Sequence, residues 1–216
     1  ECAKAHSFYF ILRKELLQYM RNNQESVWML QTKRADFNAI AARFHISPVT
    51  ARIIRNRDVE GEKAIDRYLN GTLDQLYDPH LMKDMDKAAA LILEKIRAGV
   101  RIRIVGDYDI DGVNATYILL EGLEKLGAEA DSDIPSRMKD GYGLNIELIE
   151  RAYQDGIDTI ITCDNGIAAA EEIACGKRLG MTIVVTDHHE VPFEEEEDGK
   201  KYLLPPADAV IDPKQP

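Results

Sequence analysis

The sequence predicts an α/β protein: a parallel sheet with helices on both faces, preceded by a small helical N-terminal region. From Asp84 onward, short apolar segments alternate with helical patterns of about 9–14 residues, which is typical of βαβ units. Polar clusters follow several of these apolar segments directly. Ligands of such sheets bind at the carboxyl ends of the strands, so the same alternation predicts where a functional site lies.

The elements of this domain are predicted one by one from apolar periodicity and helix-ending glycines. Gly99 and Gly127 end two helices, because glycine readily adopts the backbone conformation that closes a helix. Helices are expected at residues 85–98, 113–126, 145–153 and 168–179, and strands at 101–105, 128–134, 159–162, 182–185 and 209–211.

The region before this domain has a pattern of short helices. Asp36 precedes a helical pattern of apolar residues, and Ser47-Pro48 is typical of a helix start. A third helix is expected over residues 62–69, closed by Asn70-Gly71. We therefore expect three parts: a weakly ordered extension at 1–27, a helical region at 28–83 and the α/β domain at 84–216.

Two of the short helices, joined by residues 44–47, have basic residues in and after the second helix (Arg52, Arg55 and Arg57). This arrangement resembles a helix-turn-helix, the motif that places its second helix in the major groove of DNA. The alternative, which we favour, is a helical cap packed on the main domain.

The charge of the chain is strongly negative but unevenly distributed. The 216 residues carry a net charge of −11, from 38 acidic and 27 basic side chains. This total alone argues against a protein that coats nucleic acid, which is normally basic. Residues 33–57 are nevertheless basic, whereas Glu194–Asp198 form an acidic run that we expect in a solvated loop. Acidic clusters that hold cations can face a polyanion, so nucleic acid stays open as a partner.

The cysteine content favours a reducing compartment. Cys2, Cys163 and Cys175 form no CxxC pair, and one is left over if two bridge, which argues against a zinc knuckle and a disulfide scaffold. No apolar run approaches the ~18 residues of a membrane span, and the start lacks a secretory pattern. We expect a cytoplasmic protein without a membrane partner.

The first polar cluster, Gly106 to Gly112, follows the strand at 101–105. On an extended segment Asp107, Asp109 and Asp111 would lie on one side, where their repulsion calls for cations such as Mg²⁺ or Mn²⁺. An EF-hand loop does not fit, because a strand precedes the cluster and the sixth residue after Gly112 is Ile118 rather than Glu. A solvated acidic turn is the remaining alternative.

Two further clusters follow later strands. Asp164 follows the third strand and is a candidate ligand, with helix capping as the alternative role; Cys163 beside it is expected to be a small buried filler. The cluster Asp187-His188-His189 follows the fourth strand. Adjacent histidines are expected to point in different directions, so that one binds a metal and the other a substrate oxygen or a supporting group.

These clusters together resemble those of the DHH phosphoesterase superfamily: Asp109-x-Asp111-Gly112, Asp164-Asn165-Gly166 and Asp187-His188-His189. More narrowly, the chain is similar to the RecJ family of single-strand-specific DNA exonucleases, through residues 106–112, Ser136-Arg137 with 141–144, and 210–214. The resemblance covers roughly residues 28–216. It implies a two-lobed core followed by an oligonucleotide-binding domain. The given residues would end inside the first lobe, so we expect these residues alone to be nearly inactive.

The resemblance implies a two-cation site, with Mn²⁺ or Mg²⁺, that hydrolyses phosphodiesters. Asp109 and Asp164 would hold one ion, and Asp111, Asp164 and His188 the other. Val105 stands where many members have a histidine ligand, and Asp107 is the expected substitute.

The remaining assignments concern the substrate. His189 would contact the scissile phosphate, with Asp187 as the second catalytic residue. Arg137 would bind a phosphate, or alternatively form a surface ion pair with Asp133 or Asp140. Tyr142 would stack on a base or only shape the turn.

The implied activity is metal-dependent exonuclease cleavage of single-stranded DNA from the 5′ end, in DNA repair and recombination, alongside a helicase and a single-strand-binding protein. One alternative is a phosphodiesterase of short oligonucleotides or cyclic dinucleotides, or a related pyrophosphatase. Another is a non-catalytic replication scaffold. The long segment before Asp107 favours the exonuclease, and the three complete clusters argue against the scaffold.

Overall fold

The computed structural model describes residues 33–136, 143–196 and 199–216. The chain divides into two compact units, Glu1–Leu76 and Tyr77–Pro216. The predicted extension at residues 1–27 lies outside the described residues. In the part of the chain that the structure describes, every helix is too short or too polar to cross a membrane.

The first unit is a group of short helices, as the sequence predicts. Asp36 and Ser47 cap the first two helices, since their side chains accept hydrogen bonds from Ala39 N (2.9 Å) and Thr50 N (3.0 Å). Its small core consists of Ala41, Ala51, Ile54 and Ile65. The elements are α2 (Phe37–Phe44), α3 (Pro48–Asn56), α4 (Glu62–Asn70) and the 3₁₀ turn η1 (Leu73–Gln75).

The second unit is built on a five-stranded parallel sheet with the strand order β2-β1-β3-β4-β7. β2 lies on one side of β1, and β3 lies on the other side. The direction in which strands are added therefore reverses between β1 and β3. A ligand site is expected at such a switch point. The strands are β1 (Arg101–Val105), β2 (Glu129–Asp133), β3 (Thr159–Cys163), β4 (Thr182–Thr186) and β7 (Ala209–Ile211).

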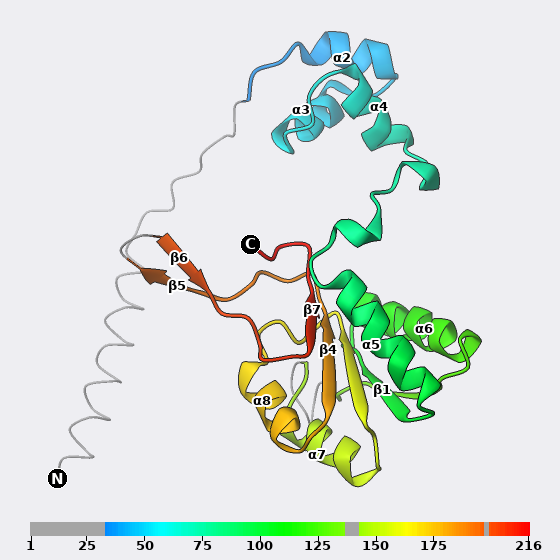
Figure 1. Cartoon of the computed structure of the whole chain (residues 1–216). Coiled ribbons are helices and arrows are strands. Elements are labelled where there is room, and N and C mark those ends of the chain that lie inside the picture. The colour runs from blue at the N-terminus through cyan, green and yellow to red at the C-terminus, as the bar shows by residue number, and fades with distance from the viewer. Residues whose placement is uncertain (1–32, 137–142, 197–198) are drawn as a thin grey trace, which may run out of the picture. The chain divides into compact units, whose positions relative to one another are not determined.

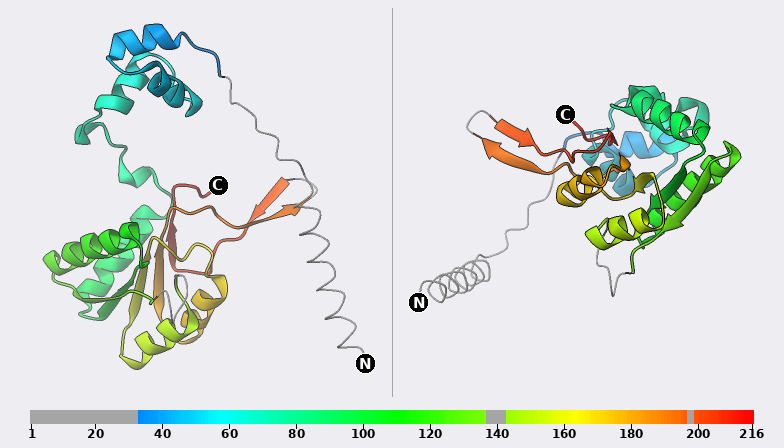
Figure 2. Two further views of the ribbon diagram at one scale, coloured as in Figure 1. Left: turned by 180° about the vertical axis from the view of Figure 1, so that it is seen from behind. Right: turned by 60° about the horizontal axis from the view of Figure 1, so that its bottom comes forward.

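Helices cover both faces of this sheet, which confirms the predicted fold class. Figures 1 and 2 show α5 and α6 on one face and α7 and α8 on the other. All five residues of the central strand β3 are buried, as expected for a parallel sheet covered on both sides. The helices of this unit are η2 (Pro79–Leu81), α5 (Met85–Arg97), α6 (Ile110–Lys125), α7 (Ile146–Gln154) and α8 (Ala170–Arg178).

The acidic run after β4 is not the loop that the sequence predicts. Glu194–Glu196 belong to strand β5 (Phe193–Glu196), which pairs antiparallel with β6 (Gly199–Tyr202); residues 197 and 198 lie outside the described residues. Lysines of β6 lie opposite two of the glutamates, and the ring centroids of the paired residues Phe193 and Tyr202 are 6.1 Å apart. These cross-strand pairs offset the low strand preference of glutamate.

Candidate metal centre

Asp107 and Asp109 follow β1 at the switch point of the sheet. Asp107 is 2% exposed, and its Oδ1 atom is buried without a hydrogen-bond partner in the described residues. Asp109 caps α6: its carboxylate accepts from the backbone N–H groups of Gly112 and Asp111, both at 3.0 Å. These bonds, that of Gly112 first, hold the pKa of Asp109 below its usual value. One carboxylate is thus desolvated and the other is held ionised beside it.

The expectation that Asp107, Asp109 and Asp111 lie along one side of an extended segment is wrong. Helix α6 begins at Ile110, three residues before its predicted start, because Asp109 is its N-cap. Asp111 therefore lies in the first helical turn and is exposed. The structure brings Asp107 and Asp109 to Asp164, with ligand atoms within 4.8 Å of one another, whereas Asp111 lies outside this cluster and lines the adjoining groove.

Asp164 follows β3 and is the carboxylate around which the described site is arranged. It belongs to both groups of candidate ligands: Asp107 with Asp109, and Asp187 with His188 and His189. Burial, and then the nearby charge of Asp109, raise the pKa of Asp164. Its alternative role as a helix cap is wrong, because α8 begins at Ala170 and its N-cap is Ala169.

Asn165 is a site residue that the sequence analysis did not assign. Its Nδ2 atom donates to the main-chain oxygens of Val105 (3.1 Å) and Cys163 (2.9 Å). These residues end β1 and β3, so Asn165 joins the two strands that carry the carboxylates. No sequence signal marks this role beyond its place after Asp164, because the bond to Val105 spans 60 residues. Cys163 is 2% exposed, in line with the expected buried filler.

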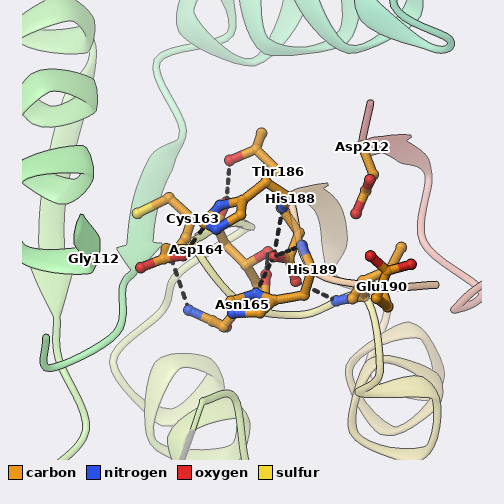
Figure 3. Close-up of polar contacts among 12 residues, drawn as sticks. Gly112, Cys163, Asp164, Asn165, Thr186, His188, His189, Glu190 and Asp212 are labelled. Atoms are coloured by element: carbon orange, nitrogen blue, oxygen red, sulfur yellow. Dashed lines mark hydrogen bonds and ion pairs between the residues drawn. The ribbon is translucent and has the colours of Figure 1, made fainter. Parts of the chain in front are cut away.

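The two histidines follow β4, and Figure 3 shows them beside Asp164 and Asn165. The expectation that they point in different directions is wrong: their rings stack, with centroids 4.7 Å apart and planes inclined by 20°. Their Nδ1 atoms nevertheless face different carboxylates. That of His188 lies 3.3 Å from Asp164 Oδ1, and that of His189 lies 2.7 Å from Asp187 Oδ1.

Asp187 orients this turn rather than standing free as a ligand. Its Oδ1 atom accepts from the backbone N–H groups of His188 (2.7 Å) and His189 (3.1 Å), and its Oδ2 atom accepts from Ile167 N (2.9 Å). The hydrogen bond from the His189 ring to Asp187 raises the pKa of His189. Asp187 thus fixes the histidine turn to the segment after β3 and favours a protonated His189.

Asp212, which follows β7, is a second residue that the sequence analysis quoted in a motif but did not place in the site. Figure 3 shows it next to His188, His189 and Glu190. It is 2% exposed; its Oδ1 atom accepts from Lys214 N at 2.7 Å, and its Oδ2 atom has no partner in the described residues. Burial, together with the charge of Asp187, raises the pKa of Asp212.

The residues present fit divalent cations. Carboxylates at this spacing, of which Asp107 and Asp164 are buried, repel one another unless a cation or a proton lies between them. Asp107 also retains a buried oxygen without a partner in the described residues. Carboxylate oxygens with one imidazole suit Mg²⁺ or Mn²⁺ better than softer metals. The observed arrangement, two ligand groups that share Asp164, is typical of a site for two cations.

Two predicted substrate residues, Arg137 and Tyr142, lie outside the described residues. Asp133, one of the alternative ion-pair partners of Arg137, accepts from Arg151 Nη2 at 2.6 Å. Asp140, the other, also lies outside the described residues.

Comparison with known proteins gives a consistent result. Residues 101–216 match the model of the DHH family, N-terminal domain. The chain is 37% identical over 190 residues to the single-stranded-DNA-specific exonuclease RecJ of Bacillus subtilis (strain 168), covering 88% of this chain and 23% of that protein. Over 169 residues it is 31% identical to RecJ of Escherichia coli (strain K12), and the match covers 78% of this chain and 27% of that protein. The chain thus spans about a quarter of the length of these relatives.

Solved structures show the same similarity. A crystal structure of exonuclease RecJ bound to manganese aligns with a TM-score of 0.54 and 35% identity, over 64% of this chain and 33% of that one. RecJ from Thermus thermophilus in complex with Mn²⁺ aligns with a TM-score of 0.55 and 28% identity, over 86% of this chain and 24% of that one.

Proposed function

The chain belongs to the DHH family, and on this basis we propose that it supplies the cation-binding catalytic lobe of a single-stranded-DNA-specific 5′→3′ exonuclease. The observation that carries the proposal is the position of Asp164, which is shared by two groups of candidate ligands at the switch point of the sheet. The similarity to RecJ proteins, which are named as single-stranded-DNA-specific exonucleases, supports single-stranded DNA as the substrate.

Asp107, Asp109 and Asp164 would hold one Mn²⁺ or Mg²⁺ ion. Asp164 and His188 would hold the other, with Asp111 as the remaining carboxylate at the edge of the same groove. A pair of such ions supplies a nucleophilic water and stabilises the leaving oxygen of a phosphodiester.

His189 would bind the scissile phosphate. Asp187 Oδ1 accepts from the imidazole at Nδ1 and favours its protonated form, so that Nε2–H is left to donate to a phosphate oxygen. A charge-assisted donor of this kind stabilises the negative charge that grows in the transition state. Asp187 acts through the orientation of His189.

The remaining assignments rest on the sequence. Arg137 would bind a backbone or terminal phosphate, and Tyr142 would contact a base. The protein would act in the cytoplasm, in DNA repair and recombination, with a helicase that opens duplexes and a single-strand-binding protein as partners.

The test compares two substrates of the full-length protein in Mn²⁺: a long single strand labelled at its 5′ end, and a dinucleotide. We expect rapid release of short products from the labelled end, and no hydrolysis in EDTA or by the Asp164→Asn variant. Preferred hydrolysis of the dinucleotide would instead support the short-oligonucleotide phosphodiesterase. Absence of hydrolysis of either substrate by the wild type would support a scaffold.

A further inference from the structure

The first unit contains a basic segment that has no role in the proposed catalytic site. Residues 33–57 contain six lysines and arginines and one acidic residue, in a chain of net charge −11. The candidate metal centre of the second unit is itself acidic. A polyanionic strand therefore gains little attraction from the centre's own side chains, and a basic surface elsewhere on the chain is a suitable place for it to bind.

Several of these cations are already paired within the unit. Arg55 lies 2.9 Å from Glu60, Arg43 lies 3.5 Å from Glu62, and Lys33 pairs with Asp58. Arg34, Arg52 and Arg57 are different: all three are exposed, and the ion pairs of the described residues include none of them. Of these three, Arg34 and Arg52 line the same hollow of the surface. These two guanidinium groups are thus available to an anion.

Arg34 and Arg52 lie beside an aromatic ring in a hollowed part of the surface. The guanidinium carbon of Arg52 lies 4.3 Å from the centroid of the Phe37 ring. Two adjoining hollows share Ala35, Phe37 and Arg52; one is completed by Lys33 and Arg34, the other by Asp36, Asn38, Pro48 and Val49. The acidic member, Asp36, accepts from Ala39 N as the cap of α2. We call Lys33, Arg34, Phe37 and Arg52 the arginine surface.

We propose that the arginine surface binds the backbone of the DNA strand that the protein degrades, an inference that rests on the proposed function. A guanidinium group forms two parallel hydrogen bonds to a phosphate, and the Phe37 ring holds that of Arg52 in place by a cation–π contact. Guanidinium planes also stack on unpaired bases. With two guanidinium groups outside the ion pairs and one ring, this surface fits a flexible single strand without a sequence preference.

The test uses the full-length protein and a fluorescein-labelled oligothymidylate in EDTA, with affinity followed by anisotropy over a range of salt concentrations. Each lost phosphate contact lowers the salt slope for single strands by about 0.7, which corresponds to about 5-fold in affinity near 0.1 M salt. We expect the Arg34→Gln/Arg52→Gln variant to bind about 25-fold more weakly, with a slope lower by about 1.4.

A matched control removes the same two charges elsewhere. Lys63→Gln/Arg178→Gln changes one exposed residue of α4 and one exposed residue in the last turn of α8, and should bind the strand as the wild type does. Phe37→Leu keeps both cations but removes the ring that holds Arg52, so its affinity should fall between those of the wild type and the double variant. Thermal melts check that every variant is folded.

The outcomes separate the surface from the catalytic proposal, because binding is measured without hydrolysis. A double variant that matches the control in affinity and in salt slope would overturn the inference. A contact with another protein would then be the alternative role of this surface. In Mn²⁺, the double variant should raise KM for the strand and leave kcat unchanged. A wild type that binds the strand but hydrolyses nothing would reject the proposed function and leave the arginine surface standing.

Discussion

Asn165 Nδ2 donates a hydrogen bond to the main-chain oxygen of Val105 at 3.1 Å, and this bond joins the carboxyl end of β1 to the residue after Asp164. The spacing between the carboxylates that follow β1 and the one that follows β3 therefore depends on the uncharged side chain of Asn165. Its Nδ2 atom donates to main-chain oxygens and not to the candidate ligands. Such supporting partners of a metal site are expected to matter nearly as much as the ligands themselves.

Asn165→Asp should weaken Mn²⁺ binding about 10- to 100-fold, the usual cost of losing a supporting contact. The substitution keeps the size of the side chain but replaces the donor by an oxygen that repels both main-chain carbonyls. Calorimetric titration with Mn²⁺ measures the change. Asn70→Asp, at an exposed position of the first unit, is the control and should bind Mn²⁺ as the wild type does; equal affinity in both variants would contradict the role of Asn165.

Asp164→Asn should abolish activity more completely than Asp107→Asn, because among the described residues Asp164 alone belongs to both groups of candidate ligands. Asparagine is the suitable replacement at this position. Asp164 has a φ of 61°, in the left-handed region that asparagine tolerates and alanine does not. The rates of single-strand hydrolysis at saturating Mn²⁺ provide the comparison. Equal losses, or a larger loss at Asp107, would reject the shared position of Asp164.

Gly112→Ala and Gly122→Ala should change stability in opposite directions although both lie in α6. A Cβ atom on Gly112 would lie 2.5 Å from the main-chain oxygen of Asp107, whereas one on Gly122 would meet nothing within 4 Å. We expect Gly112→Ala to cost ~1–3 kcal/mol and to weaken Mn²⁺ binding. Gly122→Ala should gain up to ~1 kcal/mol from helix preference alone.

Thermal and denaturant unfolding measure both glycine effects. If Gly112→Ala were as stable as the wild type, with the same Mn²⁺ affinity, the close contact between α6 and Asp107 could not be what positions the first carboxylate.

Asp187→Asn should reduce kcat about 10- to 100-fold, by analogy with other groups that orient functional histidines. Asparagine offers one acceptor oxygen in place of two, so either Ile167 N or the histidine turn loses its partner. If Asp187 acts through His189, adding the change to a His189→Ala variant should cause little further loss of kcat. Fully additive losses would show that Asp187 acts independently.

Much of the second unit was predictable because most of its strands are short apolar runs and glycines follow its helices. The three polar clusters were found for the same reason: each follows a buried strand. The position of Asp111 was not predictable, because an Asp-x-Asp segment suits an extended strand end as well as a helix cap, and the Asp109 cap decides between them. The roles of Asn165 and Asp212 depend on contacts between residues distant in the sequence. The hairpin β5–β6 was missed because its stability comes from cross-strand pairs rather than from apolar alternation.

We infer that Asp164 is shared by two cations at the switch point of the sheet. An anomalous difference map from crystals of the full-length protein grown with Mn²⁺ tests it most directly. We predict two peaks roughly 3.5–4 Å apart, both in contact with the Asp164 carboxylate, one on the side of Asp107 and Asp109 and one on the side of His188. A single peak, or peaks that Asp164 does not contact, would contradict the account.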